Sequence, residues 1–334
     1  MLAVVILNYN GLEYTTKCLF SLSKQTQKDF LTIVVDNASS QDPSEIPKKY
    51  RDIIFLRRDI NGGYAGGNNT GINYALEKGC ESVVLLNNDT LVAENFVERI
   101  QMALDAHRDF GILGPMIYSM KEPDKILTEG VLFNRPEYNG FFEVQNLAVK
   151  ISEPPNIEKT DIVNGCCLAA RKEIFDSIGL IDEQFFIICE ESDFCIRAAE
   201  HGFKCGIITE SLVWHKQGAT FTSGYDYDLK SYYNARNLWL LLNKRSGRGS
   251  LSKGRFASRL QYLRTIYYMC CTGLENGVEN TTIAVIDGVA DALSGKFGRI
   301  SKKRNIVVKF LVQIGFKFIY RVSIILKNFK RQLK

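Results

Sequence analysis

Strand-like and helix-like segments alternate through the first 120 residues of this 334-residue chain, and this alternation limits the possible folds more than any other feature. Short runs rich in Val, Ile and Leu are followed by longer segments with helical periodicity. The pattern is typical of βαβ units, in which helices cover both faces of a mostly parallel sheet. Strands are predicted at 3–7, 31–35, 53–56 and 82–87, and helices at 12–25 and 66–79.

The rest of the chain reads as a less regular region followed by helices. Residues 119–160 have little periodicity and several Pro and Gly, which indicates a functional loop or an irregular β excursion. We expect an α/β domain over 1–245 and a helical extension over 246–334, because the Gly- and Ser-rich segment 246–250 separates them. Helices are predicted at 171–179, 191–202, 226–245, 254–272 and 276–294.

The cysteine and charge distributions exclude several classes of protein. Nine cysteines without a Cys-x-x-Cys pair indicate reduced thiols in a reducing compartment and argue against structural zinc. The strand-like start argues against a signal peptide. Twelve Lys or Arg and no acids lie between 296 and 334, so the remaining residues are acidic overall despite the net charge of +5. This asymmetry argues against a general nucleic-acid binder and favours a tail that seeks an anionic surface.

Polar residues follow three of the predicted strands. Asn8 and Asn10 follow the first strand, Asp36 the second, and Asp89 the fourth. Ligands of open α/β sheets bind beyond the carboxyl ends of the strands, so these side chains are candidates for one site. A carboxylate there can accept a base N–H, bond a ribose hydroxyl, or hold a divalent cation against a diphosphate. Each residue alone could equally form a turn or cap a helix.

A glycine-rich segment extends from Asn61 to Gly71, with five glycines in eleven residues. Such a backbone can approach a ligand closely, and the helix after it would direct free N–H groups at an anion. No Gly-Lys-Ser/Thr follows, which excludes a Walker loop, and its place after the third strand excludes the dinucleotide fingerprint. A flexible turn is the alternative interpretation.

Two further clusters carry possible chemistry. Glu190, Glu191 and Asp193 place three acids in four residues at a predicted helix start, where the helix dipole favours ionised carboxylates. An ionised carboxylate there can deprotonate an acceptor hydroxyl, although a solvated helix start is equally compatible. His215 ends an apolar run, and beside Asp89 it would complete an oxygen and nitrogen site suited to Mn²⁺ or Mg²⁺.

Together these elements resemble the family-two glycosyltransferases with a GT-A fold, especially the rhamnosyltransferase-like and galactofuranosyltransferase-like members. The similarity covers about residues 2–245. It is carried by the strand-end motifs at 5–10, 35–39 and 87–89, the glycine segment 61–71, Asn164-Gly165, residues 179–186, the acidic run 190–197, and Trp214-His215.

The resemblance implies a role for each element. Asp36 would bond the nucleobase, and Asp89, the last residue of the family's Asp-x-Asp position, would bind the metal with His215. Glu191 would be the general base, with Glu190 beside it. Tyr233, Arg236 and Asn237 match a helix pattern of the family without an assigned role, and the other residues expected around the donor are Asn8, Asn10, Asn61, Gly63, Gly66, Asn68, Asn69 and Asn88.

Two positions depart from the family pattern. Asn87 replaces the first acid of the metal motif, so the site would rest on fewer charges. Glu191 replaces the usual Asp and is one methylene longer, a displacement of the scale that can cost about 100-fold in rate. Either the acceptor pocket compensates, or Glu190 shares the role, or activity is low.

The expected function is therefore metal-assisted, inverting transfer of a sugar from a UDP- or dTDP-sugar to a hydroxyl of a glycan or lipid-linked acceptor. A catalytically degenerate subunit that only binds a nucleotide sugar is one alternative. A sugar-phosphate nucleotidyltransferase is a weaker one, because residues 8–11 lack the basic glycine-rich loop which that class needs after its first strand.

Residues 305–327 could form an apolar helix about 34 Å long in which Lys309, Gln313, Lys317 and Arg321 share one face. Lys317 at the bilayer centre would cost roughly 3 kcal/mol, so a helix lying on an anionic membrane surface fits better than a spanning one. The expected location is the inner face of the cell membrane, as a peripheral cytoplasmic protein. Packing of this helix on the protein itself, or on a second copy in a homo-oligomer, is the alternative.

Overall fold

A computed structural model describes residues 1–128, 130–133, 142–145, 147–216, 228–245, 259, 262–271, 279–301 and 305–316. The chain divides into two compact units: the first comprises Met1–Glu183 and Glu190–Thr220, and the second comprises Gln184–Cys189 and Phe221–Lys334. The division falls before the expected boundary at residue 245, because the helix that ends there packs against a later helix of the second unit.

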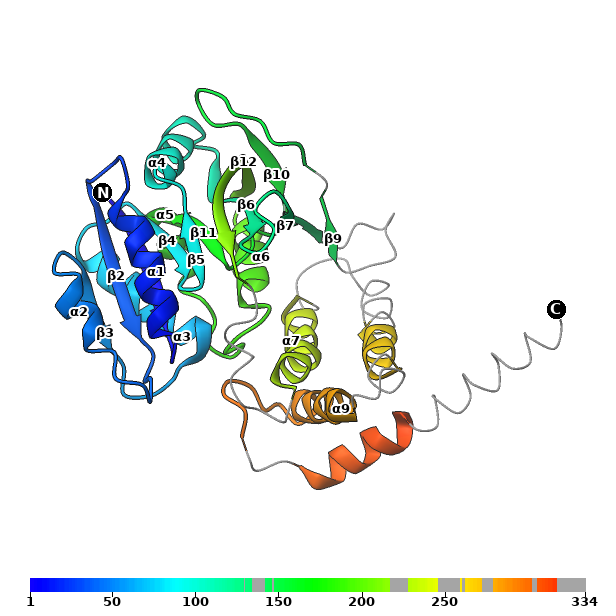
Figure 1. The fold of residues 1–334 in the computed structure, drawn as a ribbon. Helices are drawn as coiled ribbons and strands as arrows, with labels where there is room; N and C mark the ends of the chain where they lie inside the picture. The colour runs from blue at the N-terminus through cyan, green and yellow to red at the C-terminus, as the bar shows by residue number, and fades with distance from the viewer. Residues whose placement is uncertain are drawn as a thin grey trace. The chain divides into compact units, whose positions relative to one another are not determined.

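The first unit is built on a mixed sheet that has ten strands in the described part of the chain (Figure 1). One half is parallel, with the order β3-β2-β1-β4, and these are the four strands predicted from the apolar runs. The register places Asn8 opposite Asp36 and Leu7 opposite Asn87, so the polar strand ends meet at one edge. The bounds are β1 Leu2–Asn8, β2 Phe30–Asp36, β3 Ile54–Arg57 and β4 Ser82–Asn87.

The other half of the sheet joins through β11 (Cys167–Arg171), which runs antiparallel to both β4 and β6 (Phe110–Ser119). The long strand β12 (Lys204–His215) runs parallel to β6. Described residues between 119 and 160 form short strands, so this region is an irregular β excursion; residues 129, 134–141 and 146 of it lie outside the description. The remaining strands are β5 Thr90–Val92, β7 Ile126–Thr128, β8 Val131–Phe133, β9 Phe142–Val144 and β10 Ile157–Thr160.

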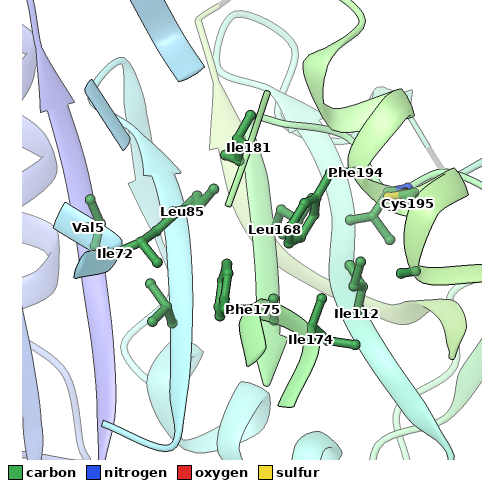
Figure 2. Close-up of a cluster of buried hydrophobic side chains, with 14 of the residues drawn as sticks. Val5, Ile72, Leu85, Ile112, Leu168, Ile174, Phe175, Ile181, Phe194 and Cys195 are labelled. Carbon is green, nitrogen blue, oxygen red and sulfur yellow. Dashed lines mark hydrogen bonds between the residues drawn. The ribbon is translucent and has the colours of Figure 1, made fainter. Parts of the chain in front are cut away.

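Helices cover both faces of this sheet and create two apolar cores. Successive residues of a strand point to opposite faces, so Val5 packs in one core and Ile6 in the other. The first core lies against α3, α5 and α6 and includes Ile72, Phe175 and Phe194 (Figure 2). The second lies against α1 and α4. The helices are α1 Leu12–Ser23, α2 Glu45–Lys49, α3 Gly63–Glu77, α4 Phe96–Ala106, α5 Lys172–Ile178 and α6 Glu190–Glu200.

The second unit is helical where it is described. It contains α7 (Leu229–Arg245), α9 (Glu279–Leu293) and helical segments at 262–271 and 306–316. Gly288 of α9 packs so closely on α7 that an added Cβ would lie 2.4 Å from the Tyr232 carbonyl oxygen. The predicted helices are therefore present in these ranges. Among the described residues, no helix has both the length and the apolar character needed to cross a bilayer.

Candidate functional site

Asp89 and His215 form the centre of the candidate site. Asp89 lies between β4 and β5, and β5 pairs antiparallel with β12 so that Thr90 is opposite His215. This register brings the Asp89 Oδ1 atom to 3.0 Å from His215 Nε2, and the Lys216 amide donates to the Asp89 carbonyl oxygen. Both side chains are largely buried. A strand pairing thus joins two residues that the sequence keeps far apart.

The pair fits a divalent cation. Neighbouring ligands of an octahedral ion with bonds of about 2.0–2.1 Å stand about 2.9 Å apart, close to the separation seen here. One carboxylate oxygen and one imidazole nitrogen also form a donor set that Mn²⁺ accepts. Within the described ranges, no group of three His, Cys, Asp or Glu residues is arranged to hold a metal. The chain here offers a two-ligand site.

A cavity of about 240 Å³ opens beside Asp89. Asn88 lines it and is held by its side-chain donation to Thr15 Oγ1 at 2.9 Å. Lys17, Lys121 and Lys216 also line it. The Lys216 ammonium donates to the Tyr14 hydroxyl and lies 4.1 Å from the centre of that ring. Glu13 also lines the cavity and forms a 2.6 Å ion pair with Lys17, so the positive charge offered to a diphosphate comes from Lys121 and Lys216. Lys216 was missed from the sequence, although it directly follows His215.

Asp36 is enclosed by the protein. Its carboxylate accepts hydrogen bonds from Asn8 Nδ2 at 2.7 Å and from the Ser39 amide at 3.2 Å, and the Arg57 guanidinium lies 3.6 Å away. The side chain has no exposed surface. Direct contact with a nucleobase is therefore closed in this structure, and the carboxylate instead shapes the loop after β2. The expected base-binding role would require this loop to open.

The other strand-end asparagines also organise loops. Asn8 is buried and donates to Asp36 and Ser39, while its oxygen accepts from the Thr15 hydroxyl. Asn10 has a positive φ of 51°, and its side-chain oxygen accepts from the amides of Ser40 and Gln41. Asn10 is exposed at the sheet edge and remains open to a ligand, whereas Asn8 is not.

The glycine segment is itself helical, because α3 begins at Gly63 rather than at Gly66 as predicted. Gly67 and Gly71 lie against β1, where an added Cβ would come within 2.3 Å of Leu7 and Val5 side-chain atoms. These glycines allow α3 to approach the sheet, so close packing, and not a ligand, explains two of the five. Gly63 and Gly66 lie in the first turn and are also buried; a Cβ added to Gly66 would lie 3.3 Å from Glu183 Oε2.

Three asparagines of this segment bond to protein groups. Asn61 accepts from the Gly63 amide at 2.8 Å, just before α3. Asn68 is buried and donates to the Tyr64 carbonyl oxygen. Asn69 donates to the Ile181 carbonyl oxygen and accepts from the Ile181 amide, which ties the 179–183 segment to α3. In this structure the side chains of Asn68 and Asn69 thus position protein segments.

Glu190 and Glu191 begin α6 beside Tyr64. A Cβ added to Gly165 would lie 3.4 Å from the Tyr64 hydroxyl and 3.5 Å from Glu191 Cβ, so Gly165, Tyr64 and Glu191 are neighbours. The carbonyl oxygen of the next residue, Cys166, accepts from the Asn87 amide at 2.9 Å. This bond brings Gly165 and its neighbours next to the expected metal motif at 87–89. Glu191 is half-buried, whereas Glu190 is buried and its Oε2 has no hydrogen-bond partner within the described part of the chain.

Burial controls the ionisation of these acids. Desolvation raises the pKa of Glu190 well above its ordinary value, and the charge of Glu191 raises it further. Desolvation also raises the pKa of Glu191. The helix start was expected to favour ionised carboxylates, but burial outweighs it. Asp193, the third acid, is bound to Arg197 at 2.7 Å and has a structural role.

Comparisons with known proteins agree with this architecture. A model of the family described as Glycosyl transferase family 2 matches residues 3–179. The low-salt glycan biosynthesis hexosyltransferase Agl10 of Haloferax volcanii is 28% identical over 248 residues, covering 72% of this chain and 75% of that protein. The dTDP-rhamnosyl transferase RfbF of Shigella flexneri is 24% identical over 246 residues, covering 72% and 79%.

Two solved structures share the fold. S. aureus TarS 1-349 in complex with UDP-GlcNAc has a TM-score of 0.56 at 16% identity, covering 89% of this chain and 83% of that one. GalNAc-T7 with UDP, GalNAc and Mn²⁺ has a TM-score of 0.54 at 14% identity, covering 78% and 55%.

The α/β fold and its relatives define a glycosyltransferase of GT-A architecture. Since the family model matches more than half of the chain, the protein belongs to glycosyl transferase family 2.

Proposed function

We propose that this enzyme transfers a sugar from a nucleoside diphosphate to a hydroxyl group of a glycan or lipid-linked acceptor, with inversion at the anomeric carbon. The observation that carries the proposal is the Asp89–His215 pair at 3.0 Å beside a lysine-lined cavity. A paired carboxylate and imidazole next to Lys121 and Lys216 suit a metal-bound diphosphate better than an uncharged ligand.

The chemistry follows from the placement of the residues. Asp89 and His215 would hold Mn²⁺ or Mg²⁺, which when bound supplies Lewis-acid stabilisation of the leaving diphosphate. Lys216 and Lys121 add positive charge on the cavity side. Glu191 accepts the proton of the acceptor hydroxyl. The acceptor oxygen bonds to the anomeric carbon while the bond from that carbon to the diphosphate breaks. A single displacement of this kind inverts the anomeric configuration.

The names of the relatives guide the choice of substrates. One relative is a dTDP-rhamnosyl transferase, and another, from Mycobacterium tuberculosis, is named for an N-acetylglucosaminyl-diphospho-decaprenol acceptor. The TarS structure contains UDP-GlcNAc. We therefore propose a UDP- or dTDP-sugar as donor and a glycan or polyprenyl-diphosphate-linked sugar as acceptor.

A nucleotide-sugar panel tests the proposal. With Mn²⁺ present, the correct donor at 100 times its Kd should stabilise the protein by about 2.7 kcal/mol, a rise in Tm of about 5–10 °C. The same donor should be hydrolysed slowly without acceptor, which separates an enzyme from a binding subunit. The proposal fails if no UDP- or dTDP-sugar both stabilises the protein and is turned over.

We also propose that the helix at 306–316 attaches the second unit to an anionic membrane surface. Its exposed face is apolar: Ile306, Val307, Phe310, Leu311 and Ile314 are each at least half exposed. Lys309, expected on the polar face of this helix, forms a 2.7 Å ion pair with the fully buried Asp287 of α9. The apolar face therefore points away from the protein; Lys317 and Arg321 lie outside the described residues.

Charge identifies the occupant of this face. The basic residues Lys302, Lys303 and Arg304 precede the helix, and no acid occurs between 296 and 334. Anionic lipid attracts such a segment with about 1 kcal/mol per basic residue near the surface, and the apolar side chains then enter the interface. A peripheral position on the inner face of the cell membrane follows.

Vesicle flotation tests this attachment. The protein should float with vesicles containing anionic phosphatidylglycerol, and less so with purely zwitterionic vesicles or at high salt. Phe310→Ser with Leu311→Ser should abolish flotation, whereas Ile60→Ser, at an apolar residue of the first unit that is 69% exposed, should not. Unchanged flotation of the double variant would contradict the proposal. Loss of a dimer in light scattering would assign the face to a second copy instead.

A further inference from the structure

The six residues Gln184–Cys189 belong to the second unit, although the residues on either side of them belong to the first. Three of the six are non-glycine residues with left-handed backbones: φ is 65° at Phe186, 74° at Ile188 and 71° at Cys189. Side chains disfavour this conformation, so it persists only where surrounding contacts enforce it. The next residue along the chain is Glu190.

The enforcing contacts come from α7. Asn237 Nδ2 lies within hydrogen-bond distance of three carbonyl oxygens of this segment, at 2.9 Å from Phe185, 2.8 Å from Ile187 and 2.7 Å from Ile188. Arg236 Nη2 donates to the Phe185 carbonyl oxygen at 2.9 Å. Arg236 Nε donates to Asn237 Oδ1, which fixes the orientation of the amide.

Burial and stacking complete the arrangement. Arg236 and Asn237 are at most 1% exposed, so their hydrogen bonds are shielded from water. The ring of Phe186 stacks on Tyr233 with centroids 5.5 Å apart, and the Arg236 guanidinium lies 4.7 Å from the centre of the same Tyr233 ring. The three residues that matched a family pattern on one helix thus act on one hexapeptide.

We propose that Arg236 and Asn237 are positioning residues for Glu190 and Glu191. They hold the carbonyl groups of Phe185, Ile187 and Ile188, which keeps the backbone left-handed up to Cys189 and sets the direction in which the first turn of α6 starts. The inference rests on the proposed function, in which Glu191 is the base. It assigns the second unit a part in turnover that is separate from any attachment to membrane.

Steady-state kinetics with Asn237→Ala test the proposal. A base displaced by about 1 Å should lower kcat by about 100-fold. The KM of the donor should stay within about twofold, because the cavity beside Asp89 is built by the first unit alone. Tyr262→Phe is the matched control: it removes a buried 2.9 Å hydrogen bond to Ala235 of the same helix without touching the hexapeptide, and it should retain kcat.

A rescue experiment separates positioning from general stability. Glycine adopts positive φ without strain, so Cys189→Gly in the Asn237→Ala background should restore kcat by about tenfold. If Asn237→Ala does not fold, Arg236→Lys carries the same measurements, since lysine cannot make both the Phe185 and the Asn237 bonds.

If Asn237→Ala keeps the wild-type kcat while Glu191→Gln is inactive, the positioning role is wrong and the proposed base stands. A reduced kcat that Cys189→Gly does not restore at all also overturns it. Full turnover by Glu191→Gln removes the base assignment, and the positioning role falls with it.

Discussion

The Nε2 atom of His215 lies 3.0 Å from Oδ1 of Asp89, although 126 residues separate the two positions in sequence. The pairing of β5 with β12 creates this contact, so the geometry of the pair is as rigid as the sheet that carries it. The paired strands thus hold the carboxylate and the imidazole side by side.

Removing either member of the pair should weaken metal-dependent turnover. Asp89→Asn and His215→Ala should each reduce transfer by at least about 100-fold and weaken Mn²⁺ binding in calorimetry with UDP present. Chelation of divalent ions should abolish transfer by the wild type, and added Mn²⁺ should restore it. Asp109→Asn, which removes an exposed ion pair with Lys204, is the control. Unchanged Mn²⁺ affinity in both variants would exclude the pair as ligands.

The buried acids should give kcat an acidic limb at unusually high pH. A base acts when it is deprotonated, and burial raises the pKa of both Glu190 and Glu191, so kcat should rise with pH through a value above the ordinary 4.5 of a glutamate. Glu191→Gln should lower kcat by about 1,000-fold while donor affinity is retained. The exposed Glu173→Gln should leave both the rate and the profile intact. A normal kcat in Glu191→Gln would refute its role as base.

The same acids should make folding stability depend on pH in a defined direction. A carboxyl whose pKa is raised in the folded state binds more protons folded than unfolded, so stability falls as pH rises from the unfolded pKa through the folded one. Glu190→Gln removes this penalty. It should therefore raise Tm at pH 7, by a margin that shrinks at pH 4, and differential scanning calorimetry at the two values checks the sign. A lower Tm at pH 7 would contradict the burial argument.

Close packing of α3 should make its glycines intolerant of a methyl group. Gly71→Ala would place a Cβ 2.3 Å from a Val5 methyl carbon, so we expect a loss of about 1–3 kcal/mol in the free energy of unfolding. Asn73→Ala, at an exposed position of the same helix, should be neutral or slightly stabilising. Urea unfolding measures both. Equal stability of the two variants would mean that α3 shifts freely on the sheet.

The cavity lysine should contribute to donor binding through charge. Lys216→Ala should raise the donor KM by about tenfold, corresponding to about 1.4 kcal/mol, with a smaller effect on kcat. Lys204→Ala, at an exposed lysine at the start of β12, should change neither. Titration of UDP with each variant at two salt concentrations measures the effect. Identical affinities would place the diphosphate elsewhere.

Local sequence pattern was sufficient to predict the strands of the parallel half of the sheet. The apolar runs of β1, β2 and β4 are long enough to be recognised without knowing their neighbours, because each strand is buried on both faces. The resemblance to a family then named the residues at their ends. The helix starting at Glu190 followed from its acids, within one residue of the structure.

Tertiary structure decided what the same residues do. Asp36 is a plausible ligand in sequence, yet its neighbours enclose it and use both carboxylate oxygens. Gly71 reads as a ligand-binding glycine until Val5 is placed 2.3 Å from its missing Cβ. The sequence places Lys309 on the polar face of a helix, and only the structure shows that Asp287 is its partner.

The amino-acid sequence by itself therefore determined the four parallel strands, the helices predicted from periodicity and the kinds of groups gathered at the sheet edge, because apolar runs and helical periodicity are local features of the chain. The partner of each group was decided only in three dimensions. Strand register and helix packing join residues such as Asp89 and His215 across long loops, and no local pattern records that pairing.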